Sequence, residues 1–390
     1  MAIRIISITS ESPHKILNGY SLRVNKLLVN AARRNDLEVH CFAPVTRENI
    51  NEAIHWADSK NIKFHGILLE REMQYDITLR AIFIKECGLL LMSHIDKDSI
   101  ILMHGLVSII DFANLECVES SIADMIDEVG PLMKRDVVKH LVNGRVKEFL
   151  RAIKSLWIYH NKTSCLLARY KNISVVAHDD AHRLRTLLPD KSIGIIPNGV
   201  DLPDRTCRRT SSEKPMVLFH GVYGYEPNEE AALFLIQSVA PLLENRLPQC
   251  RIVIAGRNPT ESMLEAGSSC PNVEIVGEID DMSNYLLTAS VGAYPIFTRT
   301  GLQNKILEAW SHCLPIVTTP EILSVFDAFS HDVLYCARTA LTANDFVEQI
   351  GDLLGDEDSC LQLSSRAFEF VKSNFEWPSV VDKFLQLHIS

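Results

Sequence analysis

The sequence lacks the patterns that mark several common protein classes. Its ten cysteines are widely spaced, with no two closer than twenty positions. It therefore contains no C-x-x-C pair, and we expect neither a zinc ribbon nor thioredoxin-like redox chemistry. No G-x-G-x-x-G occurs, which argues against a bound dinucleotide cofactor. The longest apolar stretch, 100–110, is about half a membrane span, so no transmembrane helix is predicted.

A secretory signal and a strongly basic charge are also missing. Residues 1–9 are apolar but show no cleavage site. Together with the scattered cysteines, this predicts a cytoplasmic protein with reduced thiols. The net charge is −10, divided between +3 over residues 1–200 and −13 over residues 201–390. Because duplex binding needs a clearly basic surface, no nucleic-acid partner is expected. The uneven charge indicates two separate units.

The chain has 390 residues, of which 47% are apolar, enough for two or three globular domains. The first domain is predicted to begin with a strand at 3–8, a loop containing Gly19, a helix at 22–34 and a strand at 37–42. This order is typical of a parallel α/β domain. Further elements are predicted as strands at 99–104, 173–177 and 192–196 and a helix at 179–188.

Residues 201–214 are polar and contain serine and proline, which is the composition of a linker. After this segment the alternation resumes, with strands at 216–219, 251–255, 273–276, 291–294 and 315–318 and helices at 228–243, 302–313 and 361–370. We therefore predict the α/β fold class, with two doubly wound Rossmann-like domains facing across a cleft. The predicted parts are an N-terminal domain over 1–200, a linker over 201–214, a C-terminal domain over 215–373 and a tail over 374–390 that returns to the N-terminal domain.

Ligands of such sheets bind at the carboxyl ends of the strands, and several residues there suit an anion. Gly19 precedes a helix that offers free N–H groups, although an ordinary turn would also contain a glycine. Arg257 follows the strand at 251–255 and would aim its charged fork at a phosphate. A surface arginine that caps a helix is the alternative. Gly221 lies in a further flexible loop at this edge.

The segment 301–308, Gly-Leu-Gln-Asn-Lys-Ile-Leu-Glu, follows a predicted strand and opens a helix. Gly301 would bring backbone amides against a pyrophosphate, and Lys305 would add a mobile positive charge. Glu308, one helical turn past Asn304, would accept hydrogen bonds from two ribose hydroxyls. An amphipathic helix with solvated charges is the alternative. Apolar neighbours on both sides of Glu308 argue for a packed carboxylate that needs a partner.

Taken together, these segments resemble the GT-B-fold glycosyltransferases, and specifically their retaining family-four group. The resemblance covers nearly the whole chain and is strongest over 192–320. Its words are Asn18-Gly19-Tyr20-Ser21-Leu22-Arg23, Ile196-Pro197-Asn198-Gly199-Val200-Asp201, Gly221 with Pro227-Asn228, Ala255-Gly256-Arg257-Asn258-Pro259, Gly301-Leu302-Gln303-Asn304-Lys305-Ile306-Leu307-Glu308-Ala309 and Pro315-Ile316-Val317-Thr318-Thr319.

The resemblance implies a donor nucleotide-sugar held mainly by the C-terminal domain and an acceptor held mainly by the N-terminal one. It implies that Glu308 binds the ribose and that Arg257 binds a phosphate. It also places Glu278 near the stretch whose backbone contacts the nucleobase. It implies no cofactor beyond the donor as co-substrate, and no metal. The remaining predicted donor-binding residues are Gly19, Gly221, Arg299, Thr300, Gly301, Leu302, Gln303, Asn304 and Lys305.

Two positions depart from the family pattern. The first motif glutamate of the family would fall at Thr300, so the reading of the donor sugar hydroxyls is left open. The basic residue often found just after Gly221 is missing as well. The diphosphate charge would then rest on Arg257, Arg299, Lys305 and backbone amides. The absent glutamate also admits a non-catalytic scaffold that binds a partner protein.

Three histidines are candidates for a contact with substrate or metal. The resemblance implies that His104, after the strand at 99–104, contacts the donor sugar, and it is the predicted catalytic residue; a hydrogen-bonded core histidine is the alternative. Asp111 is a weaker candidate for an acceptor contact. His178 and His182 have a spacing that can chelate zinc. Because no third ligand is evident nearby, we predict a polar helix start there and no metal site.

The segment 134–157 combines seven basic residues with an apolar stripe. A basic amphipathic helix can lie on an anionic membrane surface, and the acceptor would then be a lipid-linked sugar. The alternative is the solvated outer face of a helix that packs on its domain. The first hypothesis adds a peripheral position on the inner face of the membrane to the predicted cytoplasmic location.

The sequence therefore predicts a glycosyltransferase of polysaccharide or glycoconjugate biosynthesis. It would move a hexosyl group from a nucleoside-diphosphate sugar, with a UDP-sugar as the expected donor, to a hydroxyl of a glycan, a lipid-linked sugar or a small-molecule aglycone. The resemblance implies retention of the anomeric configuration. Two alternatives stay open, a nucleotide-sugar epimerase on the same fold and the non-catalytic scaffold. The sequence does not predict the oligomeric state.

Overall fold

The chain folds as two compact units. The computed structural model describes residues 2–16, 18–73, 76–126, 130–142, 144–203, 214–279, 281–297 and 301–389. Unit 1 comprises Met1–Asn198 and Trp377–Ser390, and unit 2 comprises Gly199–Glu376. The predicted domain boundary at residue 200 falls two residues beyond the end of the first stretch of unit 1. Most of the predicted linker, 204–213, lies outside the described residues.

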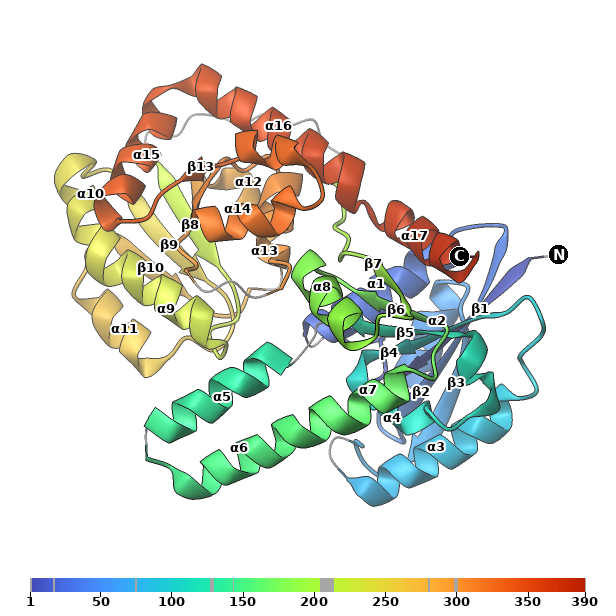
Figure 1. Cartoon of the computed structure of the whole chain (residues 1–390). Coiled ribbons are helices and arrows are strands. Elements are labelled where there is room, and N and C mark those ends of the chain that lie inside the picture. Colours follow the sequence, from blue (N-terminus) through green and yellow to red (C-terminus); the bar gives the residue numbers. More distant parts are fainter. Residues whose placement is uncertain are drawn as a thin grey trace. The chain divides into compact units, whose positions relative to one another are not determined.

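Unit 1 is built on a seven-stranded sheet with the order β3-β2-β1-β4-β5-β6-β7 (Figure 1). All neighbouring strands pair in parallel. The central strands are buried along most of their length, which explains why they read as continuous apolar runs in the sequence. The strands are β1 (Ile3–Thr9), β2 (Leu37–Thr46), β3 (Lys63–Leu69), β4 (Ile100–His104), β5 (Ser121–Ile126), β6 (Asn172–Val175) and β7 (Ser192–Ile195).

The first helix of unit 1, α1 (Gly19–Ala32), begins at a reciprocal cap. The Asn18 side chain accepts a hydrogen bond from the Ser21 amide at 2.9 Å, and the Ser21 side chain accepts one from the Asn18 amide. Such a capping box satisfies two amides that a helix start would otherwise leave unpaired. The Asn-Gly-Tyr-Ser word therefore encodes the start of α1 directly.

Two apolar cores lie on opposite faces of the sheet of unit 1. One contains Phe83 and Phe112. The other contains residues of α1 together with Trp377 and Phe384 of the C-terminal helix. The tail predicted over 374–390 is therefore largely helix, and its apolar side chains complete a core of unit 1. The helices of this unit after α1 are α2 (Ile50–Ser59), α3 (Ile77–Leu91), α4 (Gly105–Phe112), α5 (Gly130–Val142), α6 (Val146–Ile158), α7 (Ser164–Leu167), α8 (His178–Leu187) and α17 (Trp377–Ile389).

Unit 2 repeats the same architecture on a six-stranded parallel sheet, with the order β10-β9-β8-β11-β12-β13. Its core includes the fully buried Trp310, which packs edge-on against Phe326 and Phe370. The elements are β8 (Met216–His220), α9 (Glu226–Phe234), α10 (Ala240–Arg246), β9 (Arg251–Ala255), α11 (Glu261–Ser268), β10 (Val273–Val276), α12 (Ser283–Thr288), β11 (Val291–Tyr294), α13 (Asn304–Ser311), β12 (Ile316–Thr318), α14 (Pro320–Asp327), β13 (Arg338–Thr339), α15 (Ala343–Gly355) and α16 (Glu357–Phe375).

Each sheet reverses its strand order once, between β1 and β4 in unit 1 and between β8 and β11 in unit 2. At such a switch point the connections leave in opposite directions, and the carboxyl ends of the two strands border a crevice where ligands of open α/β sheets bind. The topology thus gives each unit one preferred place for a site. These observations confirm the predicted fold class of two doubly wound Rossmann-like units.

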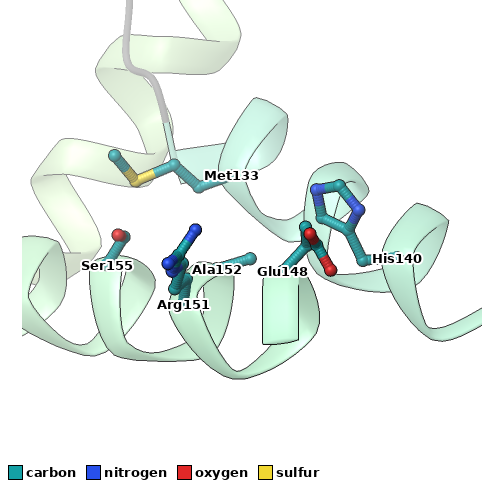
Figure 2. A pocket seen from close by; sticks show the side chains of 6 residues that line it. All are labelled: Met133, His140, Glu148, Arg151, Ala152 and Ser155. Atoms are coloured by element: carbon teal, nitrogen blue, oxygen red, sulfur yellow. The ribbon is translucent and has the colours of Figure 1, made fainter. Parts of the chain in front are cut away.

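Helices α5 and α6 form an antiparallel hairpin that extends from the rest of unit 1 (Figure 1). Between them lies an open hollow of about 380 Å³. Figure 2 shows its lining, which consists of Met133, His140, Glu148, Arg151, Ala152 and Ser155.

Over the described residues, no helix combines the length and the apolar character needed to cross a membrane.

Several predicted elements need correction. The helix predicted at 228–243 is two α-helices, α9 and α10, joined by a π-helical turn over Leu235–Val239. The strands β3, β5 and β13 were not predicted, because they are short or carry polar residues that break the apolar pattern. Among the cysteines that the structure describes, eight are free and Cys313 is disulfide-bonded. The prediction of reduced thiols, which rested on the wide spacing of the cysteines and the missing signal peptide, is therefore wrong for Cys313, because spacing along the chain does not determine which thiols meet in the fold.

Candidate functional site

The switch point of unit 2 contains a chain of three polar side chains. His220 ends β8, and its Nε2 lies 3.1 Å from Oε2 of Glu308 on α13. Its Nδ1 lies 3.0 Å from the hydroxyl of Tyr294, the last residue of β11. The Glu308 side chain is 38% exposed, whereas His220 and Tyr294 are buried. The partner that a packed carboxylate requires is thus His220, and the rest of the carboxylate faces outward.

Lys305 lies one turn before Glu308 and is held over the end of β8. Its ammonium group donates a hydrogen bond to Oδ1 of Asn228 and lies 5.4 Å from the centre of the Phe219 ring. Burial lowers the pKa of Lys305 to about 7, against an opposing effect of Glu308. A cation whose own environment disfavours its charge gains strongly from an anionic ligand.

The loop that leads into α13 brings its backbone close to this pair. Gly301 adopts φ +44°, in the left-handed region that favours glycine. Leu302 and Gln303 are buried, and Gln303 is the N-cap residue of α13. Asn304 is the first residue of the helix. The first turn of α13 thus presents backbone amides beside Lys305, which is the arrangement that binds anions at helix starts.

The loop after β9 approaches the loop after β8 at backbone contact distance. Gly256 has φ +140°, and a Cβ atom there would lie 1.8 Å from the carbonyl oxygen of Gly221. At Gly221, a Cβ atom would lie 3.4 Å from Nζ of Lys305. Arg257 follows, 36% exposed, with Nε 3.8 Å from a carboxylate oxygen of Glu278, which is 68% exposed. The predicted phosphate ligand and the predicted base-side residue are therefore neighbours.

Most of the predicted donor-binding residues come together in unit 2. Those at or beside the β8–β11 switch point are Gly221, Gly301, Leu302, Gln303, Asn304, Lys305 and Glu308, with Arg257 and Glu278 beyond the ends of β9 and β10. Gly19 starts α1 in unit 1 instead. Arg299 and Thr300 lie outside the described residues.

The switch point of unit 1 contains a buried ionic network. Arg23 on α1 binds Asp124 on β5 through two hydrogen bonds of 3.0 Å. The Ser174 hydroxyl donates a third to the same carboxylate at 2.8 Å. Burial raises the pKa of Asp124, but Arg23 and His104 outweigh it and hold the pKa below its usual range. Asp124 is therefore a carboxylate with its charge fully compensated.

The same arginine binds the end of unit 1. Its remaining N–H groups donate to the carbonyls of Ile196 and Pro197 and to Oδ1 of Asn198, at 2.9–3.1 Å. The segment around Gly19 and the segment that begins at Ile196, both part of the family resemblance, are thus joined by the Arg23 side chain. The sequence contains no signal for this contact, because the residues are more than 170 positions apart.

His104 ends β4 beside this network. Its Nδ1 lies 2.8 Å from Asp124, its side chain is fully buried, and its Nε2 has no hydrogen-bond partner among the described residues. The Tyr20 hydroxyl donates to the His104 carbonyl at 3.1 Å, and the Tyr20 ring occupies the space that a side chain at position 105 would need. The contact with Asp124 agrees with the alternative of a hydrogen-bonded core histidine. The Nε2 atom is the one that the predicted contact with a donor sugar would use.

The predicted acceptor contact Asp111 and the histidine pair of α8 both lie among charged side chains of unit 1. Asp111 pairs with Arg80 from the neighbouring helix α3. His178 and His182 lie in the first half of α8, whose first turn also contains two aspartates.

Sequence reasoning assigned no role to four residues that hold the predicted ones in place: His220, Asn228, Arg23 and Asp124. Arg23 and Asn228 lie in segments that carry the resemblance, and His220 directly precedes Gly221, so these three had a usable signal. For Asp124, a carboxylate inside an apolar strand was the available clue, since a buried charge requires a partner.

Comparison with known families agrees with this placement. Residues 214–356 match the family described as "Glycosyl transferases group 1". The chain carries a group 1 glycosyl transferase domain. The site residues of unit 2, from Gly221 to Glu308, all fall inside this glycosyl transferase domain, and the chain is accordingly an enzyme of glycosyl transfer. Comparison with the curated proteins gives no match in sequence.

Solved structures share the fold over the whole chain. A TarM variant from S. aureus, in complex with fondaparinux, α-GlcNAc-glycerol and UDP, superposes with a TM-score of 0.69 at 12% identity, covering 99% of this chain and 100% of TarM. HepE from Anabaena, in complex with UDP and glucose, gives 0.67 at 10% identity, covering 98% of each chain. A UDP-N-acetylglucosamine 2-epimerase from Listeria monocytogenes, named as putative, gives 0.59 at 11% identity, covering 99% of this chain and 95% of that one. The glycosyl transferase domain is thus part of a GT-B fold.

Proposed function

We propose that the enzyme transfers a hexosyl group from a UDP-sugar to a hydroxyl acceptor and retains the anomeric configuration. The observation that carries the proposal is the β8–β11 switch point, where Lys305, the start of α13 and the outward face of Glu308 lie together inside the matched domain. A cation and the backbone amides of a helix start suit a diphosphate, and a partly exposed carboxylate suits a ribose diol. The UDP in the TarM and HepE structures supports uracil as the base.

Each residue then has a defined task in the proposed reaction. Lys305 and the amides of the Gly301 loop neutralise the diphosphate as the bond to the sugar breaks, because stabilising charge that develops on a leaving group is the main electrostatic contribution to such a step. Arg257 supplies further positive charge toward the phosphates. Glu308, held by His220, orients the ribose. A neutralised diphosphate leaves readily, so the reaction needs no strong general acid.

His104 is proposed to contact the donor sugar through Nε2, with Asp124 fixing the other ring nitrogen. A carboxylate on Nδ1 sets the tautomer, so that Nε2 is available as an acceptor. The acceptor itself is assigned to unit 1, as a sugar, a lipid-linked sugar or a small aglycone with a free hydroxyl.

The test is thermal unfolding of the full chain with UDP, GDP, ADP, TDP and CMP, on wild type, Glu308→Ala and Glu348→Ala. Glu348 is an exposed glutamate on α15 of the same unit and serves as the matched control. A nucleotide at 100 times its dissociation constant adds roughly 2.7 kcal/mol of stability, which in a domain of this size raises the midpoint by several degrees. We expect a rise with UDP in wild type and in Glu348→Ala, and little or none in Glu308→Ala.

Other outcomes have definite meanings. A rise with another diphosphate, also lost in Glu308→Ala, would keep the site and change the base. A rise with UDP that Glu308→Ala retains in full would remove Glu308 from the site. No rise with any nucleotide would favour the non-catalytic scaffold, which also predicts no sugar release from any donor.

The epimerase alternative rests on the fold likeness to the Listeria protein. Donor alone distinguishes the two reactions, because an epimerase needs no acceptor. Incubation with UDP-sugars should leave the nucleotide-linked sugar unchanged until an acceptor is added. A changed sugar that is still linked to UDP would replace glycosyl transfer with epimerisation as the proposed function.

The α5–α6 hairpin is proposed to bind the surface of an anionic membrane from the cytoplasmic side. Its apolar side chains face solvent rather than a core: Leu150 is 59% exposed and Trp157 63% exposed. Exposed basic residues lie on the same helix, at Lys147, Arg151 and Lys154. Apolar and cationic side chains that share an exposed helix are typical of interfacial binding. Such a position would give the enzyme a lipid-linked acceptor.

Co-sedimentation with vesicles tests this contact. The protein should bind vesicles that contain anionic lipid, bind neutral vesicles weakly, and lose binding in the double variant Leu150→Ser, Trp157→Ser. Equal recovery of wild type and variant in the supernatant would reject the membrane contact and leave the hairpin as a solvated element.

A further inference from the structure

Three histidines gather in unit 1, away from the switch point of that unit. His40 lies on β2 and His65 on the neighbouring strand β3, and His94 lies in the connection between α3 and β4. His65 pairs in register with Phe42, two residues from His40, so the two imidazoles project from the same face of the sheet. His94 precedes the amino end of β4. The cluster therefore belongs to the part of the sheet opposite to the carboxyl ends that form the switch point.

The ring nitrogens lie close enough to share one ion. One ligand nitrogen from each of the three histidines lies within 4.8 Å of the other two. Nδ1 of His40 is 3.0 Å from Nε2 of His65, so one of the two nitrogens donates a hydrogen bond to the other, and a bound ion would replace the shared proton. Two imidazole nitrogens bound tetrahedrally to one zinc ion lie about 3.3 Å apart, given Zn–N bonds near 2.0–2.1 Å. The pair is thus already near ligand spacing. Over the described part of the chain, this is the group of histidine, cysteine and carboxylate side chains that satisfies such a limit.

Outer hydrogen bonds already select the nitrogens that face inward. Nε2 of His40 lies 2.8 Å from a carboxylate oxygen of Glu38, and Nδ1 of His94 lies 2.8 Å from the carbonyl of Leu90. When these nitrogens donate, Nδ1 of His40 and Nε2 of His94 are left with lone pairs. Metal-bound histidines in proteins are held in this way by a carboxylate or a backbone carbonyl on the distal nitrogen.

The cations near the three rings do not leave the cluster with an unpaired positive charge. Nearby cations have their own acidic partners, since Lys63 lies 2.5 Å from Glu38 and Arg4 lies 3.0 Å from Asp96.

We propose that His40, His65 and His94 form a binding site for a divalent transition-metal ion, with Zn²⁺ as the preferred ion and solvent as the fourth ligand. Three imidazoles and no thiolate suit zinc, copper or nickel rather than magnesium or calcium. The bound ion would join β2, β3 and the segment before β4, and its role would be to stabilise unit 1. The sequence predicted no metal, because the three ligands come from separate elements and show no spacing motif.

Titration of the metal-free, untagged full chain with Co²⁺ tests the site, followed by competition with Zn²⁺. Tetrahedral nitrogen coordination gives Co²⁺ a visible absorption that octahedral aqueous Co²⁺ lacks. We expect one equivalent to produce this spectrum in wild type and Zn²⁺ to abolish it. His55→Gln, which removes an exposed histidine of unit 1, is the matched control and should behave as wild type.

Two kinds of variant then identify the ligands. Glu38→Gln, which weakens the outer partner of His40, should lower the affinity roughly 10–100-fold. His65→Gln and the half-buried His94→Gln remove ligands and should lower the affinity further, with circular dichroism as the check on folding. If His65→Gln does not fold, His94→Gln decides alone. The proposal is overturned if wild type gives no tetrahedral spectrum, or if the ligand variants bind as tightly as His55→Gln.

Discussion

The two switch points use ionisable side chains in opposite ways. In unit 1, the side chains of Arg23, Asp124 and His104 are at most 1% exposed, and the charges of the arginine and the carboxylate meet inside the protein. In unit 2, Glu308 keeps more than a third of its side-chain surface in solvent, and Lys305 is held by an amide rather than by a carboxylate. The same topological position thus holds a closed network in one unit and an open one in the other.

This difference shows which groups are available to a ligand. Moving a charged pair into the interior costs solvation that the pairing only offsets, so a buried pair such as Arg23 and Asp124 serves mainly to fix the groups that it binds. A cation that lacks a carboxylate partner, such as Lys305, can instead lower its free energy by binding an anion. Whether a charge is paired inside the protein therefore distinguishes the structural Arg23–Asp124 pair from Lys305, which can bind a ligand.

The largest expected effect is the difference in stability between variants that each lose one carboxylate, Asp124 of unit 1 or Glu308 of unit 2. Asp124→Ala leaves the Arg23 guanidinium buried and unpaired, and should lower the free energy of unfolding by about 3–5 kcal/mol. Glu308→Ala should cost less than about 1 kcal/mol, because its carboxylate is partly solvated and pairs with a histidine. Urea denaturation measures both, and similar losses in the two variants would contradict the distinction.

The same contrast predicts how acid acts on unit 1. The pKa of Asp124 is lower in the folded protein than in the unfolded chain. Its stabilising effect is therefore complete above the unfolded value of about 4 and is lost as the pH falls through the folded value. Wild type should accordingly lose its stability advantage over Asp124→Ala only well below pH 4, when unfolding is measured at stepwise lower pH.

The backbone contact in unit 2 should be almost as sensitive. Gly256→Ala would force a methyl group against the Gly221 carbonyl and strain a positive φ, which together should cost about 2–4 kcal/mol. Gly224→Ala is the matched control, because a methyl group there meets no atom within 4 Å. Denaturation of the two variants measures the difference, and equal stability would mean that the two loops separate easily.

The open network should also respond to pH through its ligand. Because the pKa of Lys305 is about 7, a rise in pH above 7 removes the proton that a diphosphate needs. The dissociation constant for UDP should rise by up to about tenfold per pH unit above 7, since one pKa unit equals 1.36 kcal/mol. Calorimetric titration at pH 7, 8 and 9 measures this, and Lys305→Arg, which stays charged, should give a flat profile. Parallel profiles in both proteins would exclude Lys305 as the titrating group.

The smallest expected effect concerns His104. If its Nε2 contacts the donor sugar, His104→Gln should lower kcat about tenfold, the value of one hydrogen bond of roughly 1.4 kcal/mol, while the affinity for UDP stays within twofold. A purely structural histidine would instead change stability and leave kcat unaltered. Steady-state kinetics with a UDP-sugar and an accepted hydroxyl compound, alongside UDP titration, distinguishes these outcomes.

The sequence predicts the parts of the fold that depend on local pattern. The apolar run of β1 and the helical spacing after Gly19 are encoded within a few residues, and both predicted elements are present in the structure. The helix α1 begins three residues before the predicted start at 22, because the Asn18 side chain caps it there. The segment from Gly301 to Glu308 is also local, because its spacing places Lys305 and Glu308 on one side of a helix. These are the features that short-range steric and hydrogen-bonding rules determine.

What the sequence does not predict is pairing across the sheet. His220 and Glu308 are 88 positions apart, and Arg23 and Asp124 are 101 apart. Each contact depends on the strand order, which brings the carboxyl ends of β8 and β11, or of β1, β4 and β5, together. The three histidines near β2 and β3 escape prediction for the same reason, since no periodicity relates them.

The C-terminal helix α17 has a consequence for how the chain folds as it leaves the ribosome. Unit 2 is one continuous segment and can fold as soon as Gly199–Glu376 has emerged. The first stretch of unit 1 is synthesised before unit 2, but its core lacks Trp377 and Phe384 until α17 has also emerged. Domains usually fold in order of synthesis, with the N-terminal one first. Here unit 2 can be complete before unit 1, and the apolar surface of unit 1 that packs against α17 stays uncovered while unit 2 is synthesised.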